Sequence, residues 1–275
     1  MKVIYVSCSN PGVCQTERQE TLRVFEDVEC VVVQDMVFTE TAKYADILLP
    51  ACHWFETTEL AVMSRNVPYL VWQDKVIDPL YESKPDFEIY KLIAEKMGYG
   101  EFFDMDSEDF IKLWLDSDAA RDLGITFEKL KEEKEARFLP GETYISFEGG
   151  SFTTPSKRAR FYQEKVVPSY NVGQEIDESK DKTFLYWQPA LEADVNSPAR
   201  AKHPFSVCSD HLRTRTHVQW LDVEYMKELE PSPLVRLTPE AEEGLGIEEG
   251  EAVKRNTDHS FMNMTATPND RTRPT

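Results

Sequence analysis

The stretch QDMVFTETAKYADILLPACHWFE, residues 34–56, contains the pattern that decides the fold. It follows the apolar run CVVV and opens with the polar pair Gln34-Asp35. TETAKYA then predicts a short helix with Thr39 as its N-cap, and DILLP predicts a strand. Continuous apolar runs separated by a helix are typical of parallel strands buried on both faces. The stretch therefore predicts a βαβ unit in which a buried strand ends in a carboxylate.

The sequence around this stretch extends the same α/β pattern. Residues 2–7 predict a strand and residues 16–27 a helix. Three further helices are predicted in SKPDFEIYKLIAEKMG, SEDFIKLWL and TFEKLKEEKEA. In the first, the predicted apolar stripe is Phe87, Tyr90, Ala94 and Met97, and Gly98 ends the helix; the other two have Ser107 and Thr126 as predicted caps.

The last part of the chain has a different, β-rich character. HPFSVCSD and PLVRL predict strands, and EEGEAVKR predicts a turn into a strand. TPEAEEGLGI predicts a short helix with Thr238 as its cap and Pro239 at its first position. We therefore expect an α/β domain with a parallel sheet over residues 1–139, a Pro- and Gly-rich crossing region over 140–200, and a compact, barrel-like β-rich domain over 201–275.

Composition narrows the possible partners. The 275-residue chain is 41% hydrophobic, which is enough for a core, and its net charge is −19. Such a charge repels nucleic acid and anionic membrane surfaces. No stretch approaches the roughly 18 apolar residues of a membrane span. The five cysteines form no CxxC pair, which argues against a disulfide framework and against metal ligands in this chain, and predicts reduced, mostly buried thiols.

Polar residues follow two neighbouring strands of the predicted sheet. Asn10 lies in the loop after the first strand, and Asp35 ends the second. Ligands of open parallel sheets bind at the carboxyl ends of the strands. A carboxylate there can accept hydrogen bonds from a ribose diol or from N1 and N2 of guanine, so the pattern suits a nucleotide. No GxGxxG or Walker A motif is present. Alternatively, Asp35 caps the TETA helix.

A second cluster is SDHLRTRTHVQW, residues 209–220, which is basic within an acidic chain. In an extended segment, alternation would place Arg213, Arg215 and His217 on one face. Arginine forks with neighbouring hydroxyl groups suit a pyrophosphate. The spacing of the two histidines, without a thiolate pair, does not suit zinc. The alternative is an exposed basic loop that pairs with the acidic surface.

These motifs together resemble the carboxyl-terminal portion of the molybdopterin oxidoreductases of the dimethyl-sulfoxide-reductase superfamily. The resemblance covers nearly the whole chain and is weakest over residues 100–140 and 165–200. It is carried, in order, by SNPGVCQTE, VVVQDMVFTETAKYADILLPACHWFE, KPDFEIYKLIAEKMG, FTTPSKRARFY, and HPFSVCSDHLRTRTHVQW followed by TPEAEEGLGIEEGEAVKRN.

The resemblance implies a bis(molybdopterin guanine dinucleotide) cofactor with molybdenum. It also implies that residues 1–139 are part of a Rossmann-like nucleotide-binding domain and that residues 201–275 are a double-psi, aspartate-decarboxylase-like barrel, which we expect to be truncated at its end. Asn10, Gln34, Asp35 and Asp86 match the positions that hold a guanosine. Residues 209–217 match the loop around the pyrophosphate and dithiolene end; the positions carried over are Ser209, His211, Arg213, Arg215, Thr216 and His217. We assign no catalytic acid or base.

The chain lacks two features that the family carries upstream, an iron–sulfur cysteine cluster and a molybdenum ligand. We therefore expect a cofactor-binding fragment, inactive alone, of an enzyme that reduces, transfers an oxygen atom to or from, or dehydroxylates a small molecule. Its expected partners are the missing amino-terminal half or a partner chain, which would carry any iron–sulfur cluster, and an iron–sulfur electron-transfer subunit. The alternative is a non-catalytic scaffold subunit of the same fold; the polar strand ends favour the enzyme.

Overall fold

The computed structural model describes residues 1–15, 17–64, 67–139, 145–162, 187, 193–209, 211–258 and 260–268. The chain divides into two compact units, one formed by Met1–Leu139 with Ser209–Pro274 and the other by Pro140–Cys208. In the described part of the second unit, the regular elements are the 3-10 turns Glu148–Gly150 and Pro198–Ala201. The domain boundaries expected from the sequence remain predictions.

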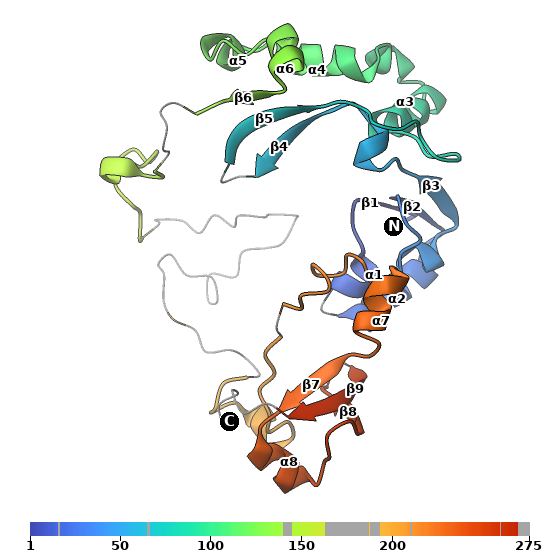
Figure 1. Ribbon diagram of the computed structural model, residues 1–275, viewed down its shortest axis with the longest axis vertical. Coiled ribbons are helices and arrows are strands. Elements are labelled where there is room, and N and C mark those ends of the chain that lie inside the picture. Colours follow the sequence, from blue (N-terminus) through green and yellow to red (C-terminus); the bar gives the residue numbers. More distant parts are fainter. Residues whose placement is uncertain are drawn as a thin grey trace. The chain divides into compact units, whose positions relative to one another are not determined.

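A parallel sheet of three strands opens the first unit (Figure 1). The strands β1 (Val3–Ser7), β2 (Cys30–Asp35) and β3 (Ile47–Pro50) lie side by side in chain order. Their register pairs Ser7 with Gln34 and Asp35 with Pro50, so the polar strand ends meet at one edge of the sheet. The predicted parallel α/β arrangement is therefore confirmed for this region.

One face of this sheet packs on a helix. The helices α1 (Pro11–Cys14) and α2 (Arg18–Asp27) lie between β1 and β2, and Phe25 of α2 packs against Val31 and Val33, which are buried. The short helix after β2 is a 3-10 turn, η1 (Ala42–Tyr44). Thr39 was the predicted N-cap; Thr41 takes that place in the backbone, although the Thr39 hydroxyl still accepts the Ala42 N–H at 3.2 Å.

The second sheet was not predicted from the sequence. Strands β4 (Glu59–Ser64), β5 (Val67–Gln73) and β6 (Glu135–Arg137) form an antiparallel sheet in that order. In β5, Leu70 and Trp72 are buried at alternate positions, as the period of a half-buried strand requires.

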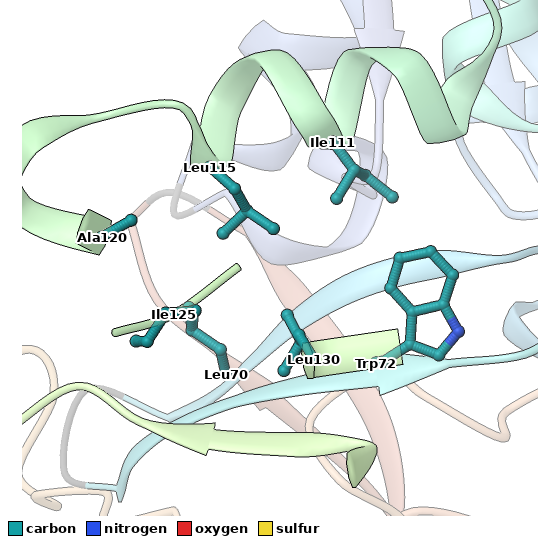
Figure 2. Packing of buried hydrophobic residues seen from close by; sticks show 7 residues of the cluster. All are labelled: Leu70, Trp72, Ile111, Leu115, Ala120, Ile125 and Leu130. Atoms are coloured by element: carbon teal, nitrogen blue, oxygen red, sulfur yellow. The ribbon is translucent and has the colours of Figure 1, made fainter. Parts of the chain in front are cut away.

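Helices cover one side of that sheet. They are α4 (Ser107–Leu115), α5 (Asp118–Asp122) and α6 (Phe127–Glu133), preceded along the chain by α3 (Asp86–Lys96) and the 3-10 turn η3 (Gly100–Phe103). Figure 2 shows the resulting core, in which side chains of the helices meet those of β5. Its members are Leu70, Trp72, Ile111, Leu115, Ala120, Ile125 and Leu130.

Two helix details differ from the sequence expectation. The α3 stripe is not a simple core face, because Ile89 and Ala94 are buried whereas Tyr90 and Met97 are exposed. The N-cap of α4 is Asp106, not Ser107, and its carboxylate accepts the Asp109 N–H at 2.8 Å. In α6 the predicted cap is confirmed, with the Thr126 hydroxyl accepting the Lys129 N–H at 3.2 Å.

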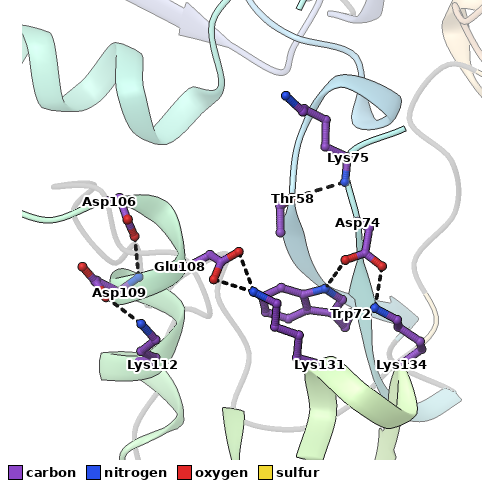
Figure 3. A network of polar contacts seen from close by, with 10 residues as sticks. All are labelled: Thr58, Trp72, Asp74, Lys75, Asp106, Glu108, Asp109, Lys112, Lys131 and Lys134. Carbon is purple, nitrogen blue, oxygen red and sulfur yellow. Dashed lines mark hydrogen bonds and ion pairs between the residues drawn. The ribbon is translucent and has the colours of Figure 1, made fainter. Parts of the chain in front are cut away.

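Ion pairs border this core at the surface (Figure 3). Lys131 of α6 reaches Glu108 of α4 at 2.7 Å, and its ammonium lies 5.3 Å from the Trp72 ring centroid. Lys134 pairs with Asp74, which also accepts the Trp72 indole N–H at 2.9 Å. These two bonds, from Lys134 first and Trp72 second, lower the pKa of Asp74. The charges here are therefore paired with one another around a closed apolar core.

The carboxyl-terminal region contains α7 (Glu224–Leu229), β7 (Leu234–Leu237), α8 (Pro239–Leu245), β8 (Ala252–Asn256) and β9 (Phe261–Pro268). β9 lies between β7, which is parallel to it, and β8, which is antiparallel. Thr238 caps α8 as predicted. Described residues 203–209 form no strand, so that prediction was wrong. A closed double-psi barrel stays a prediction.

The cysteines and the hydropathy of the helices complete the description. All five cysteines are free thiols, and none is buried, so the expectation of mostly buried thiols was wrong. Within the described ranges, no helix combines the length and the apolar character that crossing a bilayer requires.

Candidate functional site

The edge of the parallel sheet brings together four of the predicted residues. Gln34 and Asp35 are consecutive in β2, so their side chains point to opposite faces of the sheet. Asn10 follows β1 and Asp86 begins α3. The site therefore has two halves, one on each face, joined at the end of β2.

Asn10 is held by Thr41. Its Oδ1 accepts the Thr41 hydroxyl at 2.6 Å and the Thr41 N–H at 3.2 Å, while the same hydroxyl accepts the Gly12 N–H at 2.9 Å. Thr41 is fully buried. A Cβ on Gly12 would lie 3.1 Å from the Thr41 hydroxyl oxygen, so the close approach favours glycine. These contacts fix the loop after β1 against the loop after β2 and orient the Asn10 amide.

Gln34 joins two other side chains. It is 1% exposed, its Oε1 accepts the Tyr5 hydroxyl, and its Nε2 donates to Asp86 Oδ1 at 2.6 Å. Burial, followed by the neighbouring Tyr90 and Asp86, raises the pKa of Tyr5 to about 12, so the phenol stays protonated and keeps its donor at neutral pH. Asp86 itself is exposed. The buried amide therefore connects the sheet to a carboxylate that faces the surroundings.

Asp35 is a half-buried carboxylate at the opposite face. Its Oδ1 accepts the N–H groups of Met36 and Val37 at 2.8 and 3.4 Å. Asp35 therefore closes the turn after β2. It does not cap the TETA helix, which was the alternative interpretation of this residue. Burial raises the pKa of Asp35; the two backbone donors lower it, and the carboxylates of Asp222 and Asp86 raise it further. A hydrogen-bond donor from a ligand would relieve this burial cost.

Asp86 also lies on the wall of an apolar hollow of about 960 Å³. Residues of α3, η3, α4 and β4 form its walls, among them the stripe that the sequence assigned to the core. The stripe members on the wall are Phe87, Tyr90, Ala94 and Met97. The stripe therefore forms part of a partly open apolar surface beside the carboxylate of Asp86.

The second predicted group, Ser209 to His217, does not form the extended ribbon that alternation would need. A tight turn closes at Thr216 and Gln219, and His217 has a left-handed backbone with φ of 52°. Arg215 pairs with Glu230 at 3.3 Å, and Thr214 donates to the same carboxylate. The segment is therefore not extended, so the alternation that would place Arg213, Arg215 and His217 on one face does not apply.

Two exposed members of this group lie close to each other. The rings of His211 and His217 lie edge to face, with 5.6 Å between centroids. Ser209, Arg213 and Thr216 are exposed as well. Among the described residues, Arg213 forms no ion pair. Arg215 therefore stabilises the turn through its pair with Glu230, whereas Arg213 is exposed at the surface.

Sequence reasoning missed two residues of the site. The sequence pattern places Tyr5 in an apolar strand and Thr41 in a short helix, and it indicates no role in binding for either residue. The only signal for Tyr5 is its position on the face of β1 that carries Gln34 in β2, which becomes visible once the register is known. Thr41 gives no signal beyond its place in the TETA motif.

Comparison with known proteins gives the context of this arrangement. The family model described as Molybdopterin oxidoreductase matches residues 1–96. The chain is 26% identical over 277 residues to the trimethylamine-N-oxide reductase of Vibrio vulnificus, a match that covers 92% of this chain and 32% of the relative. It is 35% identical over 104 residues to the dimethyl sulfoxide/trimethylamine N-oxide reductase of Cereibacter sphaeroides, covering 38% of this chain and 13% of that protein.

The fold has a counterpart among solved structures. Acetylene hydratase from Pelobacter acetylenicus superposes with a TM-score of 0.72 over 98% of this chain and 35% of its own, at 21% identity. Residues 1–96 therefore match the molybdopterin oxidoreductase family, and most of the chain is similar to members of the dimethyl-sulfoxide-reductase superfamily.

The molybdopterin oxidoreductase family implies a molybdenum–pterin cofactor. The chain spans about a third of the length of the curated relatives that it matches along most of its own length. The polar strand ends lie within the part matched by the family model, and the turn of residues 209–217 lies outside it.

Proposed function

We propose that this chain is a cofactor-binding part of a molybdenum-dependent oxidoreductase. In this proposal Asn10, Gln34, Asp35 and Asp86 form the site of a guanosine, and the turn from Ser209 to His217 binds the pyrophosphate and dithiolene end. The ligand is a bis(molybdopterin guanine dinucleotide). The complete enzyme would reduce, dehydroxylate or transfer an oxygen atom to or from a small molecule.

The observation that carries the proposal is the carboxylate of Asp35. One of its oxygens closes a turn, while no bond to the other occurs among the described residues. Guanine offers two adjacent N–H donors, at N1 and N2, which suit an acceptor at the end of a strand. Because burial raises the pKa of Asp35, such donors would stabilise its ionised form.

The turn of residues 209–217 supports the other half of the proposal. Arg213 presents a planar set of donors for an anionic group, and Ser209 and Thr216 of the same segment are also exposed. Arg215, held by Glu230, supports the shape of the turn. The net charge of −19 makes this local basic cluster the chemically suitable place for a pyrophosphate.

The cofactor supplies the two-electron chemistry when it is bound, and the residues of this chain bind and orient it. The molybdenum ligand, the substrate contacts and any iron–sulfur centre would come from further protein, either the remainder of a longer chain or a partner. A scaffold subunit that has lost the cofactor is the competing proposal, and cofactor content separates the two.

The test is the cofactor content of the assembly in which the chain works, purified through a tag on this chain from cells supplied with molybdate. Wild-type assembly is expected to release guanine nucleotide and molybdenum in a fixed ratio. Asp35→Asn preserves the acceptor for Met36 and Val37 but turns the second oxygen into a donor. We expect at least about a tenfold loss of guanine nucleotide, because a hydrogen bond to a charged group contributes about 1.5–3 kcal/mol.

Asp27→Asn is the matched control. Asp27 is exposed at the end of α2, before β2 begins, and its change should leave guanine content unaltered. Wild-type assembly without molybdenum or guanine would favour the scaffold. Unchanged guanine in Asp35→Asn would remove Asp35 from the site.

Asp35→Asn also has an expected effect on the stability of the protein. A carboxyl whose pKa is raised in the folded state binds its proton more tightly there, so the free energy of unfolding decreases as pH rises from the unfolded pKa through the folded one. Above that window wild type carries the cost of the ionised Asp35, and Asp35→Asn does not. Without cofactor, the variant should therefore melt at a higher temperature than wild type at pH 7 and not at pH 3.

A further inference from the structure

We propose that Gln34 and Tyr5 are positioning residues that fix the carboxylate of Asp86 for the ligand, and that Gln34 does not bind the ligand itself. This inference rests on the proposed guanosine site and assigns the division of labour within it. The juxtaposition that carries it is a chain of two hydrogen bonds, from the Tyr5 hydroxyl to Gln34 and from Gln34 to Asp86.

The amide of Gln34 is already occupied on both sides. Its oxygen accepts from Tyr5 and its nitrogen donates to Asp86 at 2.6 Å, and the side chain is 1% exposed. A ligand at the sheet edge would have to displace one of these partners to reach it. Displacement would leave a buried polar group unpaired, which is costly. Gln34 is thus placed to act through its neighbours.

Tyr5 decides which way the amide points. Because the phenol is a donor, it selects the Gln34 oxygen and turns the Gln34 nitrogen toward Asp86. The flipped amide would set two acceptor oxygens 2.6 Å apart, an arrangement that carboxylate and carbonyl oxygens avoid. The raised pKa of Tyr5 keeps the donor proton in place at neutral pH.

Asp86 gains a defined orientation from this arrangement. It is the first residue of α3, its neighbour Pro85 offers no side-chain cap, and its side chain is exposed. An exposed aspartate would otherwise sample several rotamers. The bond from Gln34 holds one oxygen against the sheet and directs the other outward, at the positive end of the helix dipole. Preorganisation of this kind raises affinity by reducing the ordering that binding requires.

The inference predicts an energetic coupling that a structural role would not produce. The probe is guanosine 5′-monophosphate, GMP, titrated calorimetrically into the assembly purified from molybdate-starved cells. The variants are Gln34→Leu, Asp86→Ala and the double variant. Gln34→Leu should weaken GMP binding about tenfold when Asp86 is present, since it removes a bond to a charged group. In the Asp86→Ala background the same change should weaken binding less than about twofold.

Tyr5→Phe gives an independent version of this cycle for the case that Gln34→Leu does not fold. Tyr5 is partly exposed, and the change removes only the hydroxyl. We expect about threefold weaker GMP binding with Asp86 present and no change in the Asp86→Ala background. Tyr99→Phe, which removes an exposed tyrosine hydroxyl from the wall of the apolar hollow, is the matched control and should bind GMP as wild type does.

The outcomes separate the inference from the proposed function. Equal losses with and without Asp86, or no loss in any Gln34 or Tyr5 variant, would overturn the positioning role while Asp35→Asn still weakens GMP binding. Absence of GMP binding to the wild-type assembly, or full binding by Asp35→Asn, would overturn the guanosine site itself.

Discussion

The two sheets of the first unit treat their polar groups in opposite ways. Around β4, β5 and β6, the carboxylates pair with lysines at the surface, and the interior is apolar (Figures 2 and 3). At the ends of β1 and β2, the Gln34 amide and Thr41 are buried; Gln34 donates to Asp86 and Thr41 donates to the Asn10 amide oxygen. Neither Asp35 nor Asp86 forms an ion pair with any described residue.

This difference distinguishes a structural region from a binding region. The charge of a carboxylate that is paired with lysine is already neutralised within the fold, so a ligand adds little to its stabilisation. Asp35 is half-buried, one of its oxygens accepts backbone N–H groups, and burial raises its pKa. Hydrogen-bond donors of a ligand can therefore stabilise its ionised form. The contrast can be measured, because variants in the core of the first region should change stability without changing ligand affinity, whereas variants in the second region should change ligand affinity.

The largest stability effect is expected from Leu130→Ala. Leu130 is fully buried in the core beneath β5, and truncation leaves a cavity. The free energy of unfolding should fall by about 3 kcal/mol, measured by urea denaturation, while GMP affinity of the folded protein stays within about twofold. Leu113→Ala, at an exposed position of α4, is the control. A large loss of GMP affinity in folded Leu130→Ala would break the separation of the two regions.

Thr41→Val should affect both quantities. The change keeps the shape but leaves the Gly12 N–H without its acceptor, and it leaves Asn10 Oδ1 with only the longer bond from the Thr41 N–H. We expect about 2 kcal/mol less stability and weaker GMP binding, because Asn10 loses its orientation. Thr21→Val on α2, whose hydroxyl donates to the Glu17 carbonyl, serves as the comparison. Unchanged GMP affinity in a destabilised Thr41→Val would show that Asn10 is not part of the site.

Lys131→Met should have the smallest effect. The Lys131–Glu108 pair is partly exposed, so its loss should cost about 0.5 kcal/mol, with a similar amount for the contact with Trp72. Denaturation at low and high salt measures it, because screening weakens the pair in wild type and not in the variant. Lys129→Met on the same helix is the control. A cost above about 2 kcal/mol would show that the polar border supports the core directly.

Much of the first sheet could be predicted from local pattern. Continuous apolar runs gave β1, β2 and β3, and the polar residues at their ends indicated the edge where the candidate site lies. The hairpin of β4 and β5 was missed, because its short alternating strands resemble loops when the partner strand is unknown. The turn at residues 213–219 could not be predicted, because nothing in RTRTH indicates the left-handed backbone of His217.

The amino-acid sequence by itself determined that a carboxylate and amides would gather at the end of a buried parallel sheet, because strand boundaries follow from the local order of apolar and polar residues. Only the tertiary structure decided which polar atoms are already bonded within the fold. Tyr5 and Gln34 are 29 positions apart, and Gln34 and Asp86 are 52 apart. A hydrogen bond at that separation depends on strand register and on the placement of α3, and no local pattern encodes either.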